Sequence, residues 1–126
     1  VKELERFTNF ILNEYKGTRK IWNYELLIKT IDCDTSGYYF ECNEIEIGNK
    51  TSKRSLAKKR EWYISSYFHE ICHFAQDNLD KVKDYKLDYT EADAANCTNK
   101  YYKNPMEIQA REFEDKYTKI YLELYY

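Results

Sequence analysis

The sequence predicts an α+β fold in which helices pack on a small, mostly antiparallel sheet. Apolar residues recur every three or four positions at the start of the chain, alternate with polar residues after about Lys20, and return to helical spacing after about Leu56. The chain has 126 residues, of which 43% are hydrophobic and 17% aromatic. This is enough for one folded domain over residues 1–126 with its own core.

The first predicted element is a helix over residues 2–16, followed by Gly17 as a C-cap. Apolar residues recur along it at helical spacing: Leu4, Phe7, Ile11 and Tyr15. We expect this helix to pack over the sheet.

Two extended stretches should form the sheet. Alternation of apolar and polar residues over 20–29 is typical of a strand. The turn-forming sequence 34–37 then leads to a second extended stretch over 38–48. At its end isoleucines alternate with glutamates from Glu44 to Ile47, so we interpret residues 43–48 as an edge strand with one charged side.

A long helix is predicted from near Leu56 to near Asn78, and it contains the sequence HEICH at residues 69–73. In a helix His69 and His73 lie on one face with Cβ atoms about 5–6 Å apart, so both imidazoles can bind one metal ion. Glu70 points about 100° around the helix, where its carboxylate can reach a water on the metal without binding the metal. The chain has 2 His, both in this motif, which favours a metal site over two buried structural histidines.

The last helix begins after Asn104, a good N-cap, with Pro105 in the first helical position. Before it, residues 77–93 form a polar, acidic connection, with a short helix near 91–102. The last helix carries one apolar stripe: Met106, Ala110, Phe113, Tyr117, Ile120, Tyr121 and Leu124.

The third protein ligand must be a carboxylate or a thiolate, because there is no third histidine. Glu107 and Glu114 both lie beside the apolar stripe of the last helix, about 10.5 Å apart along its axis, so only one can reach the metal. Glu107 also occupies a capping-box position after Asn104, which is a purely structural explanation. Glu91 is a third candidate because it is nearer to His73 in sequence. Geometry alone leaves Glu107 and Glu114 equal.

Charge and hydropathy exclude several partners. The formal net charge is -2 and no apolar run approaches the length of a membrane span, so we expect no nucleic-acid and no membrane partner. The basic segment Lys50–Arg60 is interpreted as a solvated surface. No leader of basic and then apolar residues opens the sequence, so we expect a cytoplasmic protein, with secretion as the alternative.

The 4 Cys show no C-x-x-C spacing, which argues against a structural zinc cluster. We interpret all of them as small buried hydrophobes: Cys33, Cys42, Cys72 and Cys97. A disulfide between Cys33 and Cys42 is an option only for a secreted protein.

The sequences HEICH at 69–73 and EIQAREF at 107–113 resemble the HExxH zinc metallopeptidases, the zincins, and within them the gluzincin-like branch. They are most similar to the compact minigluzincins and the ImmA/IrrE-type peptidase domains of bacteria and phages, whose second-helix pattern is E-x-x-A-x-x-F. The resemblance implies that Zn²⁺ is held by His69, His73 and Glu107. It also implies a zincin-like arrangement: a small twisted sheet, an N-terminal helix, the HExxH helix and a C-terminal helix that carries the glutamate ligand.

One position departs from the family. Thermolysin-like relatives carry an aspartate four residues after the ligand glutamate, which orients a metal-bound histidine. Here that position is Arg111, so the partners that orient the two histidines are not identified from the sequence.

By resemblance the protein is a zinc-dependent metallopeptidase, an endopeptidase in which Glu70 is the general base for a metal-activated water. A peptide or protein substrate would dock along residues 43–48 by β-augmentation. Tyr101 or Tyr102 could stabilise the oxyanion, although core packing is the expected role of both. The alternative is a zincin-fold binding or regulatory domain with little or no proteolytic activity, and iron or another transition metal could replace zinc. The oligomeric state is not predicted.

Overall fold

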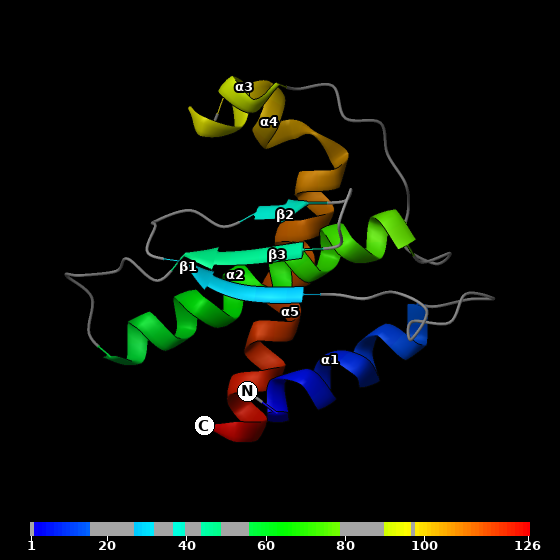
Figure 1. Cartoon of the computed structure of the whole chain (residues 1–126), viewed down its shortest axis with the longest axis vertical. Helices are drawn as coiled ribbons and strands as arrows, with labels where there is room; N and C mark the ends of the chain where they lie inside the picture. Colours follow the sequence, from blue (N-terminus) through cyan, green and yellow to red (C-terminus); the bar gives the residue numbers. More distant parts are fainter. Residues whose placement is uncertain are drawn as a thin grey trace.

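The computed structural model describes residues 2–15, 27–31, 37–39, 44–48, 56–78, 90–96 and 98–126. Its elements, in chain order, are α1 (Lys2–Tyr15), β1 (Leu27–Ile31), β2 (Gly37–Tyr39), β3 (Glu44–Gly48), α2 (Leu56–Asn78), α3 (Glu91–Ala95), α4 (Asn99–Lys103) and α5 (Pro105–Tyr125). The described part is mostly helical with one small sheet, which confirms the α+β class in its broad form (Figure 1).

The sheet is mixed, with the strand order β1-β3-β2. β1 and β3 run parallel over all five residues of each strand, whereas the shorter β2 runs antiparallel to β3. The prediction of a mostly antiparallel, twisted sheet is therefore wrong, because the longer pairing is parallel. β3 pairs antiparallel with its neighbour in sequence, β2, and lies between β2 and β1, to which it runs parallel.

β3 is the central strand, so the prediction that residues 43–48 form the edge of the sheet is also wrong. The alternation itself is confirmed. Ile45 and Ile47 are fully buried, whereas Glu44 on the other face is partly exposed and pairs with Lys29 at 2.8 Å. Alternation reports which face of a strand is buried, but it does not report whether one or two strands lie beside it.

The core joins α1, α2, α5 and β3. Phe68 on α2 is fully buried, and its ring meets the edge of Phe7 on α1 at a centroid distance of 5.8 Å. Tyr117 and Tyr121 of α5 close the same aromatic cluster at 6.3 and 6.2 Å from Phe68. The predicted apolar stripe of α1 is confirmed at Leu4, Phe7 and Ile11, which are all buried.

α5 begins as predicted. The Asn104 side chain accepts a hydrogen bond from the Met106 N–H at 2.9 Å, and Pro105 is the first helical residue. The helix crosses α2, and this crossing is the most extensive contact between described elements (Figure 1). Ala110 is fully buried, and its small side chain allows a close approach of the helix backbone. The exposed Leu124 departs from the predicted stripe.

The segment before α5 contains two short helices, α3 and α4, where one was predicted. Thr90 and Asp93 form a capping box at the start of α3, and Thr98 donates a further hydrogen bond to Asp93 at 2.9 Å. Other predicted features lie outside the described residues: the alternating residues before Leu27, the turn at 34–36, Cys33, Cys42, Asn43, Cys97, most of the connection after Asn78, and basic residues 50–55.

None of the helices that the structure describes is long and apolar enough to cross a lipid bilayer.

Candidate metal centre

The two motif histidines lie one turn apart on α2, as the sequence predicts. Their ring centroids are 5.0 Å apart, and the rings are inclined at 73° to each other. Each side chain keeps about a seventh of its surface exposed, at 15% for His69 and 14% for His73. The pair is therefore largely shielded from water but not fully buried.

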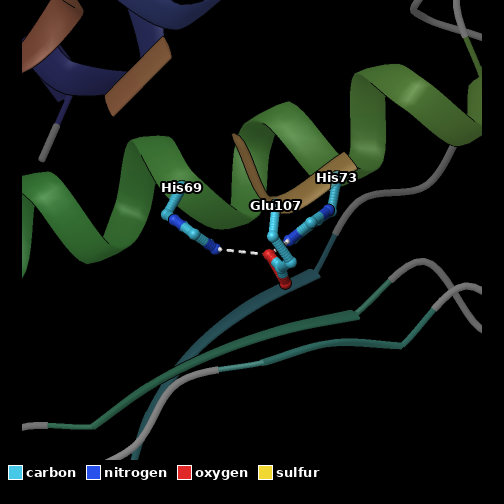
Figure 2. A group of neighbouring side chains, drawn as sticks. All are labelled: His69, His73 and Glu107. Carbon is cyan, nitrogen blue, oxygen red and sulfur yellow. Dashed lines mark hydrogen bonds and ion pairs between the residues drawn. The ribbon is translucent and has the colours of Figure 1, made fainter. Parts of the chain in front are cut away.

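Glu107 of α5 supplies the third group. Its Oε2 lies 3.2 Å from Nε2 of His69 and 3.0 Å from Nε2 of His73, and the residue is 3% exposed. Figure 2 shows both imidazoles pointing at this carboxylate. One ligand atom from each of these residues lies within 4.8 Å of the others, and no other such group occurs in the part of the chain that is described.

The structural alternative for Glu107 does not account for this position. A capping box would use the Asn104 N–H as the donor to Glu107. That N–H instead donates to the carbonyl of Tyr101 at 3.2 Å. The carboxylate of Glu107 is directed at the histidines. Glu91 begins α3, and its side chain lies outside the described part.

Glu114 contacts the other ring nitrogen of His69, the one that does not face Glu107. Its Oε1 lies 2.8 Å from Nδ1 of the ring. An ionised carboxylate can only accept, so Nδ1 is the donor. In the neutral imidazole the lone pair is then on Nε2, the atom that faces Glu107.

Gln76 contacts Nδ1 of His73 in the same way. Its Oε1 lies 2.8 Å from Nδ1 of His73, while its Nε2 donates to the Met106 carbonyl at 3.0 Å and to Oε1 of Gln109 at 2.8 Å. These two acceptors fix the orientation of the amide, so Nδ1 of His73 is also a donor. Gln76 thereby links α2 to the residue directly before Glu107.

Three acceptors consequently face one another when both imidazoles are neutral. Two nitrogen lone pairs and a carboxylate oxygen at these distances repel unless a cation or protons lie among them. Two imidazoles and one carboxylate are ordinary ligands of divalent transition metals. The cluster is therefore compatible with a bound metal ion.

Without a metal, protons would take this role. Burial alone would lower the pKa of His69, but its hydrogen bonds to Glu107 and Glu114 outweigh burial and raise that pKa to about 10. The pKa of His73 is raised for the same reason, against burial, by its hydrogen bond to Glu107. Burial would raise the pKa of Glu107, but its hydrogen bonds to both histidines lower that pKa instead.

Glu70 is 7% exposed and is not one of the three converging groups. Burial raises the pKa of its carboxyl, and the charges of His73 and His69 offset part of this effect. A carboxyl with a raised pKa beside this cluster is a better proton acceptor than an ordinary glutamate.

The orienting roles of Glu114 and Gln76 were not predicted from the sequence. Two spacings in the sequence could have indicated these roles: three residues between His73 and Gln76, and seven residues between Glu107 and Glu114. Arg111 takes no part in orienting a histidine in the described contacts, since it stacks on the ring of Tyr102, 4.2 Å from its centroid, and donates to the Tyr102 carbonyl.

Two further residues keep structural roles. Tyr102 is 52% exposed and its ring stacks with the guanidinium of Arg111, so the expectation that it packs in the core is wrong. Cys72 lies between the histidines in sequence and is a free, fully buried thiol whose pKa is raised by burial, as expected for a small hydrophobe.

Comparisons of the chain with protein-family models, with curated proteins and with solved structures found no match. The likeness to zincins therefore rests on the two sequence motifs and on the residues that the fold brings together.

Proposed function

We propose that the protein is a zinc-dependent metallopeptidase. The observation that carries this proposal is the convergence of His69 Nε2, His73 Nε2 and Glu107 Oε2, with both Nδ1 atoms hydrogen-bonded to acceptors. Tetrahedral zinc with bonds of about 2.0–2.2 Å holds its ligand atoms roughly 3.3–3.5 Å apart. The 3.0 and 3.2 Å separations are close to this spacing.

When bound, zinc would act as a Lewis acid, lowering the pKa of water toward about 7 and polarising a peptide carbonyl. Glu70 would accept the proton of the attacking water and pass it to the leaving amine. Glu114 and Gln76 would keep the imidazoles in the tautomer that presents Nε2 to the metal. Both histidines keep part of their surface accessible to solvent.

Because β3 is the central strand, a substrate peptide would not add along residues 43–48 as the sequence suggested. Over Glu44–Glu46 β3 is paired on both sides, so its backbone cannot take a further strand there. Among the described strands β2 lies at an edge of the sheet, and it contacts α2, which carries the histidines. A peptide added as a strand would use the outer edge of β2.

Cleavage of an unfolded protein by the zinc-loaded chain tests the proposal. Glu70→Gln should lower the rate about 100- to 10,000-fold, because general-base catalysis contributes about that much. It should still bind one zinc, because Glu70 is not a ligand. Glu112→Gln makes the same charge change at an exposed position of α5 and should leave the rate unchanged. Equal rates for wild type and Glu70→Gln would contradict the mechanism.

The same experiment distinguishes the peptidase from a non-proteolytic zincin-fold binding domain. That domain would bind zinc through the same residues, but the zinc-loaded wild type would cleave no protein or peptide in a broad substrate set. Zinc binding together with cleavage supports the peptidase, whereas zinc binding without cleavage supports the binding domain.

A further inference from the structure

The two histidines of the candidate metal centre are oriented by chemically different groups. Nδ1 of His69 donates to the carboxylate of Glu114, and Nδ1 of His73 donates to the side-chain amide of Gln76, each at 2.8 Å. An ionised carboxylate can only accept a hydrogen bond, whereas an amide has an acceptor at one end and two N–H donors at the other. Gln76 therefore orients His73 only if another group decides which end of its amide faces the ring.

Two groups of α5 make that choice. Nε2 of Gln76 donates to the Met106 carbonyl at 3.0 Å and to Oε1 of Gln109 at 2.8 Å. A backbone carbonyl cannot donate, so it keeps the NH₂ end of Gln76 turned toward α5. Gln109 pairs with the second N–H of the same NH₂ group. Because Gln76 is 3% exposed, that N–H would lose its acceptor in a place nearly closed to water if Gln109 were absent.

Turning the amide over would disable His73 as a ligand. Oε1 of Gln76 would then face the Met106 carbonyl, and the NH₂ group would face the proton on Nδ1 of His73. The neutral ring could avoid this clash only by moving its proton to Nε2. Nε2 is the atom that lies 3.0 Å from Glu107, and a ring nitrogen that carries a proton cannot bind a metal ion. The orientation of one amide therefore decides whether His73 is available to a metal.

The same contacts lie on both sides of Glu107. Met106 directly precedes Glu107 and Gln109 follows it by two residues, so both acceptors of Gln76 belong to the turn of α5 that carries the third converging group. One side chain of α2 thus orients the ring of His73 and ties this turn of α5 to α2.

We propose that Gln109 is a positioning residue of the metal centre, which acts through Gln76 on His73 and on the turn that carries Glu107. The inference rests on the proposed function, since that function places zinc among these residues. It deepens that function, because a residue outside the ligand set then determines which nitrogen of His73 meets the metal.

Methionine at position 109 removes the acceptor with little change in length and none in charge. Gln109→Met should weaken zinc binding about fivefold, less than the 10- to 100-fold usual for a direct partner of a ligand, because the Met106 carbonyl remains. Gln109→Glu keeps an acceptor for Gln76 and should bind zinc at least as tightly as wild type. The matched control is Ile108→Met at the neighbouring exposed position, which should leave the affinity unchanged. Competition with a chromophoric chelator measures all four chains.

A double substitution shows whether Gln109 acts through Gln76. Gln76→Met removes the orienting partner itself and should weaken zinc binding about 10- to 100-fold. Adding Gln109→Met to that chain should cause no further loss, because the effects of residues that act through one contact are not additive. A further fivefold loss in the double variant would show two independent effects and overturn the positioning role.

NMR of the ring nitrogens provides a readout that packing alone would not change. In the zinc-loaded wild type both imidazoles should carry a proton on Nδ1. In Gln109→Met the Nδ1 proton of His73 should exchange with water about tenfold faster, whereas that of His69, held by Glu114, should keep its wild-type rate. Equal acceleration at both rings would indicate a general loosening of the site and overturn the inference.

The wild-type chain separates this inference from the proposed function. If it binds no zinc, the proposed function is overturned, and the role of Gln109 at a metal with it. If it binds one zinc with an affinity that Gln109→Met leaves unchanged, the inference is overturned and the peptidase proposal stands.

Discussion

At the scale of single residues, two glutamates of α5 that helix geometry alone left equivalent contact opposite nitrogens of one ring. Glu107 faces Nε2 of His69, and Glu114 faces Nδ1 of the same ring. Because Glu114 fixes the position of the proton, it makes Nε2 available as a ligand atom. The two carboxylates therefore have different expected effects on metal affinity.

Substitution by glutamine should separate them. Glu107→Gln removes the charged ligand and should abolish stoichiometric zinc binding. Glu114→Gln should retain one zinc per chain with an affinity about 10- to 100-fold lower, the usual effect of removing an orienting partner. Competition against a chromophoric chelator measures both, with Glu112→Gln as the control. A larger loss of zinc affinity for Glu114→Gln than for Glu107→Gln would show that Glu107 is not the ligand.

The sequence predicted the three residues that converge, but not the groups that orient the histidines. His69, Glu70 and His73 follow from spacing within one helix, where geometry is fixed by the backbone. The contacts of Gln76 and Glu114 depend on how α2 crosses α5, and spacing within one helix does not determine that crossing. Glu107 was preferred over Glu114 only through the resemblance to a family, and its position agrees with that preference.

At the scale of elements, α1 is joined to α2 by a buried hydrogen bond as well as by packing. Thr8 Oγ1 donates to the Leu4 carbonyl at 2.7 Å, so Tyr67 is the donor in the 2.9 Å contact between its hydroxyl and Thr8. Burial raises the pKa of Tyr67, which keeps the phenol protonated. Tyr67 lies two residues before His69, so this contact supports the helix that carries both histidines of the candidate metal centre.

Tyr67→Phe should lower the free energy of unfolding by about 1–2 kcal/mol, because it leaves a buried acceptor on Thr8 without its donor. Tyr63→Phe, one turn earlier on α2, is the matched control. Its hydroxyl makes only an exposed 3.4 Å contact with Thr30, so the change should be within about 0.5 kcal/mol. Urea unfolding of the metal-free chain compares the two. Equal losses would mean that the buried contact contributes no net stability.

Element boundaries were predicted well where local signals were strong. The helix predicted from near Leu56 to near Asn78 has those bounds, and Asn104 caps α5 through its own side chain. The sheet was predicted less well, since the strand order is set by long-range pairing. Residues 44–47 alternate in the same way at the centre of a sheet as they would at its edge, so their pattern could not place β2 and β1 on either side of β3.

At the scale of the whole molecule, folding assembles the centre from two long helices. His69 and His73 come from α2 and Glu107 from α5, so an unfolded chain has no preformed site. Binding of the proposed metal ion would then be coupled to folding, and zinc should stabilise the native state. Protons stabilise the metal-free form of the same cluster, so metal and protons compete for it.

This competition predicts opposite effects of pH on the two forms. In the metal-free chain the pKa of His69 is raised to about 10, so its stabilising contribution is complete below its unfolded pKa of about 6.5 and is lost as the pH rises toward 10. The pKa of Glu107 is lowered, so its contribution is present above about 4.5 and is lost as the pH falls. The metal-free chain should therefore be most stable between about pH 4.5 and 6.5.

Between about pH 6.5 and 8 the free energy of unfolding should fall in the metal-free chain, by an amount on the order of 1–2 kcal/mol. Over the same range the stabilisation by zinc should grow, because the ion binds neutral imidazoles and must displace fewer protons as the pH rises. Urea unfolding with EDTA or with one equivalent of zinc measures both slopes, and His69→Gln should flatten both. A metal-free chain that gains stability over this range, or a zinc effect that shrinks, would show that protons and metal do not share this cluster.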